Sequence, residues 1–254
     1  MRVEADVAWM LGVVLIALRL GVVLVATPIF NLVNVPGNIR VLFVLGLAAV
    51  IAAGIKNPLV IGELSVYGFL AAATVELIIG AALAFGLLTA FAAFALGGRV
   101  VDVQLGFGVA NLIDPATRTP APLVGTFLNL LALVIFFAID GHHMVLRGIV
   151  FSLEQTPPGT ALPDLDIGVL AAQFGGMFVY AVSLVAPVMF GILLIDVLLG
   201  VIARMMPQMN VFIVGLPLKI FVGLSLLAFS LNYLSPALAR VFEGVFNGWH
   251  RLLG

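Results

Sequence analysis

Four ionisable side chains stand inside long apolar runs of this sequence: Arg19, Glu76, Asp196 and Lys219. A charge at the centre of a bilayer costs about 2.5–3.5 kcal/mol on insertion scales, so each of these groups needs a partner, water or the membrane interface. Such groups can relay protons in a transporter. They can also fix an assembly as salt bridges between subunits, and we favour this second role because pairing is a usual solution for intramembrane charge.

The other residues with chemical potential form weaker patterns. His142 and His143 are adjacent, so their side chains should point to different faces, and no H-E-x-x-H or similar chelating spacing occurs. Gly106-Phe107-Gly108 lacks a third glycine at the dinucleotide-binding spacing, where Asn111 stands. No serine, histidine or carboxylate constellation supports hydrolysis, and the chain has no cysteine. We therefore expect no enzyme activity and no metal or cofactor site.

The composition is that of an integral membrane protein. Of the 254 residues, 63% are hydrophobic and only 9% are charged, against about 25% in a soluble domain. The mean hydropathy is +1.29. A net charge of −1 offers no basic field for nucleic acid. No A-x-A cleavage pattern follows the first apolar run, so we expect the first helix to be retained.

Helices must position these side chains, because lipid excludes irregular backbone. Six apolar runs predict an all-α protein of about six long helices, some of them broken or folded into hairpins. As helices the runs range from about 22 Å to about 55 Å, which fits a hydrocarbon core of about 30 Å poorly. Pro187 should kink or break the fifth run. The third run could bend near Gly80 or Gly86, form a tight hairpin or project beyond the bilayer. The runs are Val7–Phe30, Val41–Ile55, Leu64–Leu96, Ala121–Ile139, Ile167–Ala203 and Met209–Leu234.

Polar interruptions separate these runs. The stretch 97–120 is too rich in Gly and Pro to be a regular helix throughout, so it should line a cavity or a seam between subunits. We expect Asp102 and the other charges of this stretch to fix the loop by ion pairs. The loop 154–166 carries three acidic residues and no Lys or Arg, so it should face away from the cytoplasm.

We expect one membrane domain over residues 1–254. Its tail has apolar residues at spacings of three and four, which predicts an amphipathic helix in the membrane interface or docked on a partner helix. In order, the sections are N-terminal helices (6–96), a polar loop region (97–120), central helices (121–203) with the acidic external loop (154–166), a helical segment (204–235) and the tail (236–254).

Two long motifs resemble signatures of the FliR family of flagellar export-gate proteins. Residues 98–107, followed by Asp114-Pro115, are similar to G-x-x-x-D-x-Q-x-G-F…D-P, and residues 204–219 are similar to R-x-x-P-Q-x-N-x-F-x-x-G-x-P-x-K. Arg19, Pro28-Ile29-Phe30, Val35-Pro36 and Arg40 stand in the family's order in the N-terminal half. The resemblance covers nearly the whole chain and fits the flagellar branch better than the virulence branch.

The resemblance implies a structural role in protein export. Family members join the smaller gate proteins P and Q (FliP and FliQ) in a helical assembly in the bacterial inner membrane, at the flagellar basal body. FlhB-type and FlhA-type components are further expected partners, unfolded flagellar proteins are the transiting substrates, and lipid surrounds the assembly. Much of the assembly stands above the membrane plane, which would explain the awkward helix lengths.

The resemblance also assigns residues to roles. A loop within 106–120 would plug the closed pore. The residues assigned to the plug, which include the end of the first signature, are Gln104, Leu105, Gly106, Phe107, Gly108, Asp114 and Pro115. The second signature would serve gate assembly and packing through Arg204, Pro207, Gln208, Asn210, Phe212, Gly215, Pro217 and Lys219.

Two alternatives remain open at this point. The chain could belong to a virulence type III secretion apparatus, which contains a related component. It could also be a secondary transporter, because Pro187 and Pro217 could break helices next to the buried carboxylates of Glu76 and Asp196.

Overall fold

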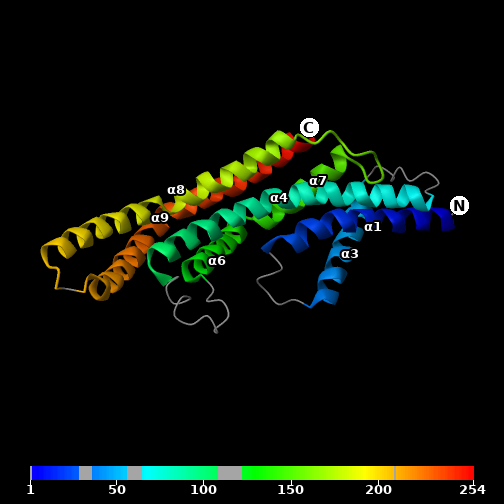
Figure 1. Ribbon diagram of the computed structural model, residues 1–254. Coiled ribbons are helices and arrows are strands. Elements are labelled where there is room, and N and C mark those ends of the chain that lie inside the picture. Colours follow the sequence, from blue (N-terminus) through cyan, green and yellow to red (C-terminus); the bar gives the residue numbers. More distant parts are fainter. Residues whose placement is uncertain (1, 29–35, 56–64, 108–121, 209) are drawn as a thin grey trace. The chain divides into compact units, whose positions relative to one another are not determined.

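The computed structural model describes residues 2–28, 36–55, 65–107, 122–208 and 210–254, and within these ranges the regular structure is entirely helical. Figure 1 shows the order of the helices along the chain. This confirms the prediction of an all-α protein. The helices are α1 (Arg2–Ala26), α3 (Gly37–Gly54), α4 (Val66–Gln104), α6 (Leu123–Ala138), α7 (Gly141–Gln155), α8 (Ile167–Met205) and α9 (Val211–Leu253).

The helices of the described ranges fit a membrane protein. Five of them are long and apolar enough to cross a bilayer, and the number rises to six if α6 and α7, which are bent at the break between them, form one broken span. The prediction of an integral membrane protein with about six helical segments is thereby confirmed.

Helix α4 is longer than the sequence pattern indicated. It continues as one helix through Gly80 and Gly86 to Gln104, so the expected hairpin is wrong and part of the stretch 97–120 is helical. With 39 residues it is about 58 Å long, which fits a helix that projects beyond the bilayer. Gly97 lies where a Cβ atom would be 2.9 Å from the carbonyl oxygen of Ala181. The low helix propensity of glycine alone predicts irregular backbone in this region. Close packing at Gly97 instead stabilises the helix there.

Prolines do not break the C-terminal helices either. Helix α8 has 39 residues and contains Pro187, and α9 has 43 residues and contains Pro217 and Pro236. Of the two outcomes expected at Pro187, a kink or a break, the break does not occur, because α8 continues through the proline. Each proline removes one backbone hydrogen bond, and membrane helices tolerate this because neighbouring groups satisfy the freed carbonyl. At 1.5 Å per residue, these helices are about 58 and 64 Å long.

Helix α3 begins earlier than expected, at Gly37 instead of Val41. The carbonyl oxygen of Pro36 accepts hydrogen bonds from the backbone N–H groups of Ile39 and Arg40, at 3.0 and 3.2 Å. Proline is well suited to a helix start, because its own fixed φ angle suits the turn and it needs no donor there. With 18 residues, α3 is about 27 Å long, which is close to a spanning length.

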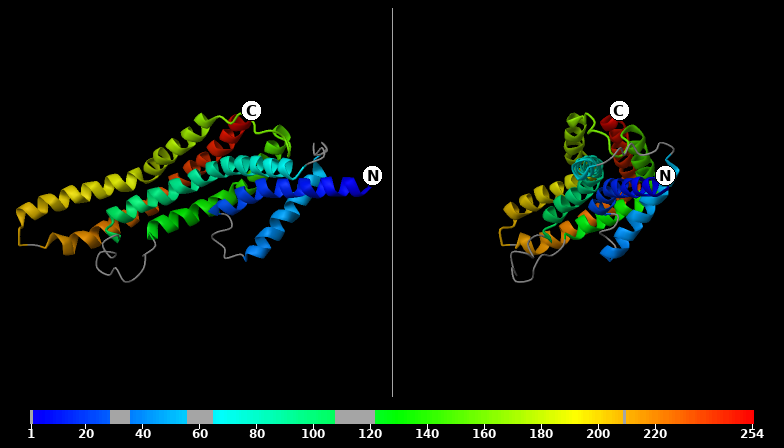
Figure 2. Two further views of the ribbon diagram at one scale, coloured as in Figure 1. Left: turned by 45° about the vertical axis from the view of Figure 1, so that its right-hand side comes forward. Right: turned by 90° about the vertical axis from the view of Figure 1, so that its right-hand side faces the viewer.

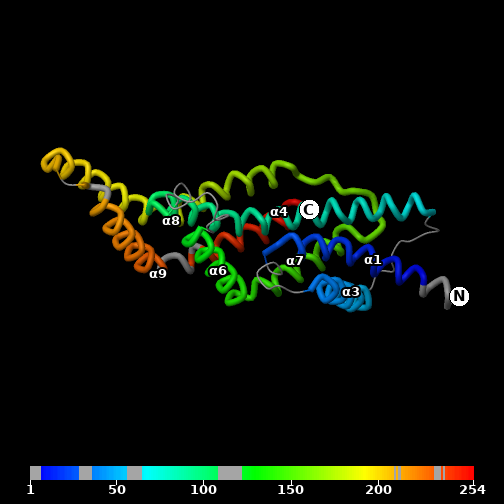
Figure 3. Tube along the Cα trace, turned by 60° about the horizontal axis from the view of Figure 1, so that its bottom comes forward, coloured from blue at the N-terminus to red at the C-terminus, as the bar shows by residue number. Residues whose placement is uncertain are grey.

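The chain forms two compact units, each built from several separate segments. The first contains residues 1–89, 140–174 and 242–254, and the second contains residues 90–139 and 175–241. In the first unit α1 contacts α3, as Figure 3 shows. Helix α1 also lies along the first part of α4 (Figure 2), where a Cβ atom on Gly80 would be 2.9 Å from the carbonyl oxygen of Arg19.

The second unit is centred on α6. Leu128, Ala132 and Phe136 repeat every four residues on one face of this helix and are fully buried. The ring of Phe136 packs against that of Phe91 on α4, with centroids 5.8 Å apart. Residues 90–104 of α4, most of α8 and residues 211–241 of α9 complete this unit.

The amphipathic tail is the end of α9 and not a separate helix. Its apolar residues Phe242, Val245, Trp249 and Leu252 are buried within the chain. The amphipathic pattern is confirmed, but the interpretation as an interfacial helix is wrong, because the apolar face already packs inside the protein. The indole N–H of Trp249 donates a hydrogen bond to the carbonyl oxygen of Leu83, at 3.1 Å.

Candidate functional site

Arg19 and Glu76 form a buried ion pair in the first unit. Nε of Arg19 lies 2.6 Å from Oε2 of Glu76, and the two side chains are 0% and 1% exposed. Arg19 is on α1 and Glu76 is on α4. The pair therefore joins two helices through residues that are 57 positions apart in the sequence. Both charges are desolvated, and the pair satisfies the requirement for partners that the sequence predicted.

The remaining donors of Arg19 bind a third helix and the loop that follows it. Nη1 of Arg19 donates to the carbonyl oxygen and the hydroxyl of Ser152 on α7, at 2.8 and 2.6 Å. Nη2 donates to the carbonyl oxygen of Thr156, at 3.0 Å. This charge clamp therefore fixes α1, α4, α7 and the start of the acidic loop to one another.

The clamp corrects our interpretation of these charges. We expected salt bridges between subunits, but Arg19 and Glu76 pair within one chain. The planar guanidinium presents its N–H donors in a fixed fork, and here all three of its nitrogens donate to acceptors of the same chain. The geometry is that of a structural lock.

Asp196 and Lys219 form the corresponding pair of the second unit, between α8 and α9. This pair is also within the chain, so each of the two charges has an intrachain partner. Lys219 is 25% exposed and Asp196 is 45% exposed, so water or a neighbouring group can reach both. Lys219 is the last residue of the second signature. The structure gives this lysine a specific partner, Asp196.

If the chain works in the assembly that the resemblance implies, replacing Asp196 by Ala should weaken that assembly more than it lowers the stability of the chain itself. The pair is partly exposed, so we expect the chain to lose only about 0.2–1 kcal/mol of unfolding free energy. Lys219 would be left unpaired at an apolar surface, and the yield of assembled complex should fall. The yield after affinity purification measures this, and the reversed pair Asp196→Lys/Lys219→Asp should restore it. If the Asp196→Ala variant assembled normally but lost a transport function that depends on protons, Asp196 would act as a proton relay.

Residues 104–107, the described start of the expected plug region, belong to the second unit. Gln104 ends α4, and Gly106 follows with φ +82°, a left-handed conformation that suits glycine. Leu105 is fully buried, and a Cβ atom on Gly223 of α9 would collide with its side chain. Leu105 is therefore a packing residue. Gly108, Asp114 and Pro115 lie outside the described residues.

Phe107 lines an apolar groove of about 380 Å³ in the second unit. The groove is formed by residues of α6 and α9, and its other lining residues are Leu123, Val124, Phe127, Leu224, Leu227, Ala228 and Leu231. Phe107, at the start of the expected plug region, thus packs against α6 and α9.

Asp102 is a structural residue whose role the sequence analysis missed. Its two carboxylate oxygens accept the backbone N–H groups of Val124 and Gly125, at 2.9 and 3.0 Å. These N–H groups belong to the first turn of α6, where a negative charge is favourable. Asp102 thus caps α6 and does not serve the expected ion pair. The spacing Gly98-x-x-x-Asp102 was the available signal, because it places both residues on one face of α4.

The second signature divides into exposed and buried residues. Its first part lies at the end of α8 and in the turn that follows, where Arg204, Pro207, Gln208 and Asn210 are exposed. Gly215 is buried, and a Cβ atom there would be 2.8 Å from Cδ1 of Leu199. Pro217 is exposed within α9, and the side chain of Phe212 lies outside the described part.

Residues 10–245 match the family of bacterial export proteins, family 1. The chain belongs to this family. Among its relatives, the flagellar biosynthetic protein FliR of Bacillus subtilis is 32% identical over 188 residues, covering 72% of this chain and 71% of the relative. FliR of Escherichia coli is 29% identical over 233 residues, covering 91% and 88% of the two chains.

A protein with a different name is also among the relatives. The surface presentation of antigens protein SpaR of Shigella flexneri is 32% identical over 123 residues, which are 48% of each chain. The similarity to the FliR proteins extends over more of the chain than this. The family match confirms the resemblance that the two signatures predicted.

Proposed function

We propose that this chain is a structural subunit of the flagellar type III export gate in the bacterial inner membrane, with no catalysis of its own. The observation that carries this proposal is the similarity to FliR proteins of two flagellated species over most of the chain. In this role the chain forms, with P and Q proteins, the pore through which unfolded flagellar proteins leave the cytoplasm. The exposed residues Arg204, Pro207, Gln208 and Asn210 of the second signature would then serve contacts of the assembled gate.

The surfaces of the long helices support a role within an assembly. Helix α8 is about twice as long as the hydrocarbon core is thick, and much of its apolar surface is exposed. Lipid can cover one hydrocarbon thickness of such a helix, and the remainder needs protein partners to remain out of water. Exposed apolar side chains along α8 include Phe174, Phe178, Phe190, Leu193, Leu194, Val197 and Leu198.

Purification of the chain from detergent-solubilised membranes tests the proposal. An affinity tag on this chain should retain P and Q proteins in excess over the tagged chain, as quantified by mass spectrometry. A chain that purifies as a lone, stable monomer from a strain producing all the flagellar export proteins would contradict the proposal.

We further propose that the segment around 106–116 plugs the closed pore. Support comes from the family resemblance and from Phe107, an apolar side chain at the end of α4 that lines a groove instead of extending a helix. An apolar constriction excludes ions by dewetting and can still deform when a protein passes.

Deleting residues 106–116 should increase ion leakage through the assembled gate. The reason is that the pore would lose its apolar constriction while the helices that form it remain. Planar-bilayer conductance of the purified complex measures the effect, and a variant with Val103→Ala, which changes an exposed side chain at the end of α4, is the control. Unchanged conductance of an intact complex rejects the plug assignment.

A virulence apparatus is the second candidate, favoured by the similarity to SpaR. Complementation separates the two functions. The chain should restore motility to a bacterium lacking its own FliR protein, and it should not restore needle-complex secretion to one lacking SpaR.

A further inference from the structure

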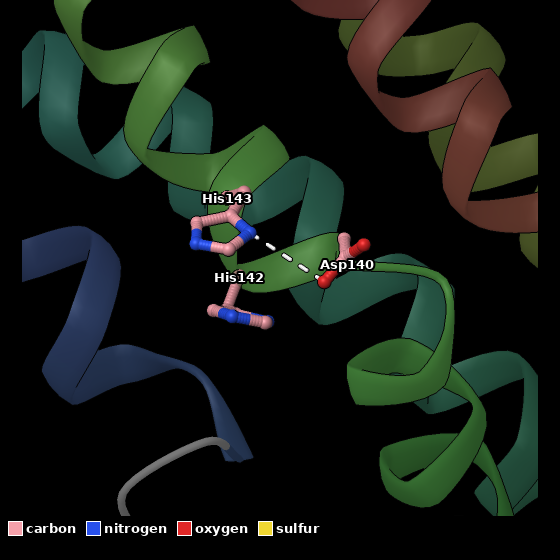
Figure 4. Close-up of side chains that lie close together, drawn as sticks. All are labelled: Asp140, His142 and His143. Atoms are coloured by element: carbon pink, nitrogen blue, oxygen red, sulfur yellow. Dashed lines mark ion pairs between the residues drawn. The ribbon is translucent and has the colours of Figure 1, made fainter.

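Two of the three histidines of the chain meet an aspartate at the start of α7. Figure 4 shows Asp140, His142 and His143 side by side, and one donor atom of each lies within 4.8 Å of the other two. Nδ1 of His143 is 3.5 Å from Oδ1 of Asp140, and the two imidazole centroids are 4.1 Å apart. Adjacent histidines were expected to diverge, and that expectation is wrong.

The backbone at Asp140 creates this arrangement. Asp140 has φ 57°, which makes it the one residue other than glycine with a positive φ in the described parts of the chain. It stands in the break between α6 and α7, and its carboxylate makes no capping hydrogen bond to α7. The left-handed conformation instead leaves the carboxylate beside His143. A short polar residue such as aspartate tolerates this conformation better than most.

We propose that Asp140, His142 and His143 bind a divalent transition-metal ion of the Zn²⁺ class. Two imidazole nitrogens and one carboxylate oxygen are the donor set that suits such ions, and small rotations of the three side chains, of which His142 is half-buried, would bring the donors to coordination distance. Asp140 is 73% exposed and His143 is 59% exposed, so a fourth position stays open to water or to another group. The charge of Asp140 offsets the positive end of the α7 dipole.

A simple ion pair would involve Asp140 and His143 only. The ring of His142 lies 4.1 Å from that of His143 between centroids, and the two ring planes are tilted by 35°. A metal ion uses all three residues, whereas an ion pair or a helix cap uses two. The contribution of His142 to binding therefore discriminates between these readings.

The experiment uses the full-length chain in detergent, carrying a peptide tag free of histidine. The chain has no cysteine and a single histidine outside the cluster, so background coordination is low. Titration calorimetry with Zn²⁺ and visible absorption with Co²⁺ should report one ion per chain. His142→Ala and His143→Ala should each weaken binding at least tenfold. Asp140→Gly should do the same without straining the backbone, because glycine accepts a positive φ.

His250→Ala is the matched control, because His250 lies on α9, where its ring packs against Phe151 at 4.3 Å. This variant should bind Zn²⁺ as the unaltered chain does. The proposal is overturned if His142→Ala binds Zn²⁺ with unchanged affinity, or if the unaltered chain binds no more tightly than the His142→Ala/His143→Ala double variant. Circular dichroism of each variant shows whether it retains its helices.

Discussion

Replacing Glu76 by Gln should destabilise the first unit more than any other conservative change. The guanidinium of Arg19 would stay buried without a countercharge, and breaking such a pair costs about 3–5 kcal/mol. The helices α1, α4 and α7 would lose their common attachment point. Fluorescence of the buried Trp249 during SDS titration of detergent-solubilised protein reports this unit, after Trp9 has been replaced by Phe.

The double variant Arg19→Met/Glu76→Met is the decisive control for this prediction. It removes both charges and replaces them by flexible apolar side chains, so it should recover much of the lost stability. If Glu76→Gln unfolds at the same SDS fraction as the unaltered chain, the clamp contributes little. If the double variant is less stable than Glu76→Gln, the hydrogen bonds of Arg19 to Ser152 and Thr156 matter more than charge balance.

Gly98→Ala should cause the largest loss of stability in the second unit. A Cβ atom on Gly98 would overlap the backbone of Gly125 on α6, and backbone cannot rotate away as a side chain can. Moving α6 would also separate Asp102 from the N–H groups it accepts. Overpacking costs about 1–3 kcal/mol and each hydrogen bond to a charged group about 1.5–3 kcal/mol, so we expect a loss above about 3 kcal/mol.

Gly175→Ala is the matched control, because it is the same substitution on a membrane helix of the same unit. A Cβ atom at Gly175 meets nothing within 4 Å. Helix propensity then predicts a gain of up to about 1 kcal/mol. Circular dichroism at 222 nm during SDS titration compares the two variants. Equal stability of both would show that the contact between α4 and α6 yields to a methyl group.

The sequence was sufficient for the features that depend on composition and local pattern. Apolar runs identified the membrane helices, and the position of Arg19 and Glu76 within them predicted that both charges need partners. The amphipathic spacing of the tail is also visible without a structure, and Trp249 lies on its apolar face as expected. The signatures at 98–107 and 204–219 identified the family.

Features that depend on contacts between distant residues could not be predicted in this way. Nothing local indicates that Arg19 pairs with a carboxylate 57 positions away or reaches Ser152. Helix propensity also misplaced the end of α4, because the close packing of Gly98 against α6 overrides it. The histidine cluster depends on one backbone angle at Asp140, which residue spacing does not reveal.

The interleaved construction of the two units has a consequence for biosynthesis. The ribosome releases Val241 before residues 242–254, so the second unit has all its residues while the first still lacks its final segment. Until then the nascent protein has no Trp249 ring to fill the space over Gly148 or to bind Leu83. A chain that terminates before Trp249 should therefore have a gap between α4 and α7 of the first unit. We expect membrane proteases to cleave such a chain at this unit first.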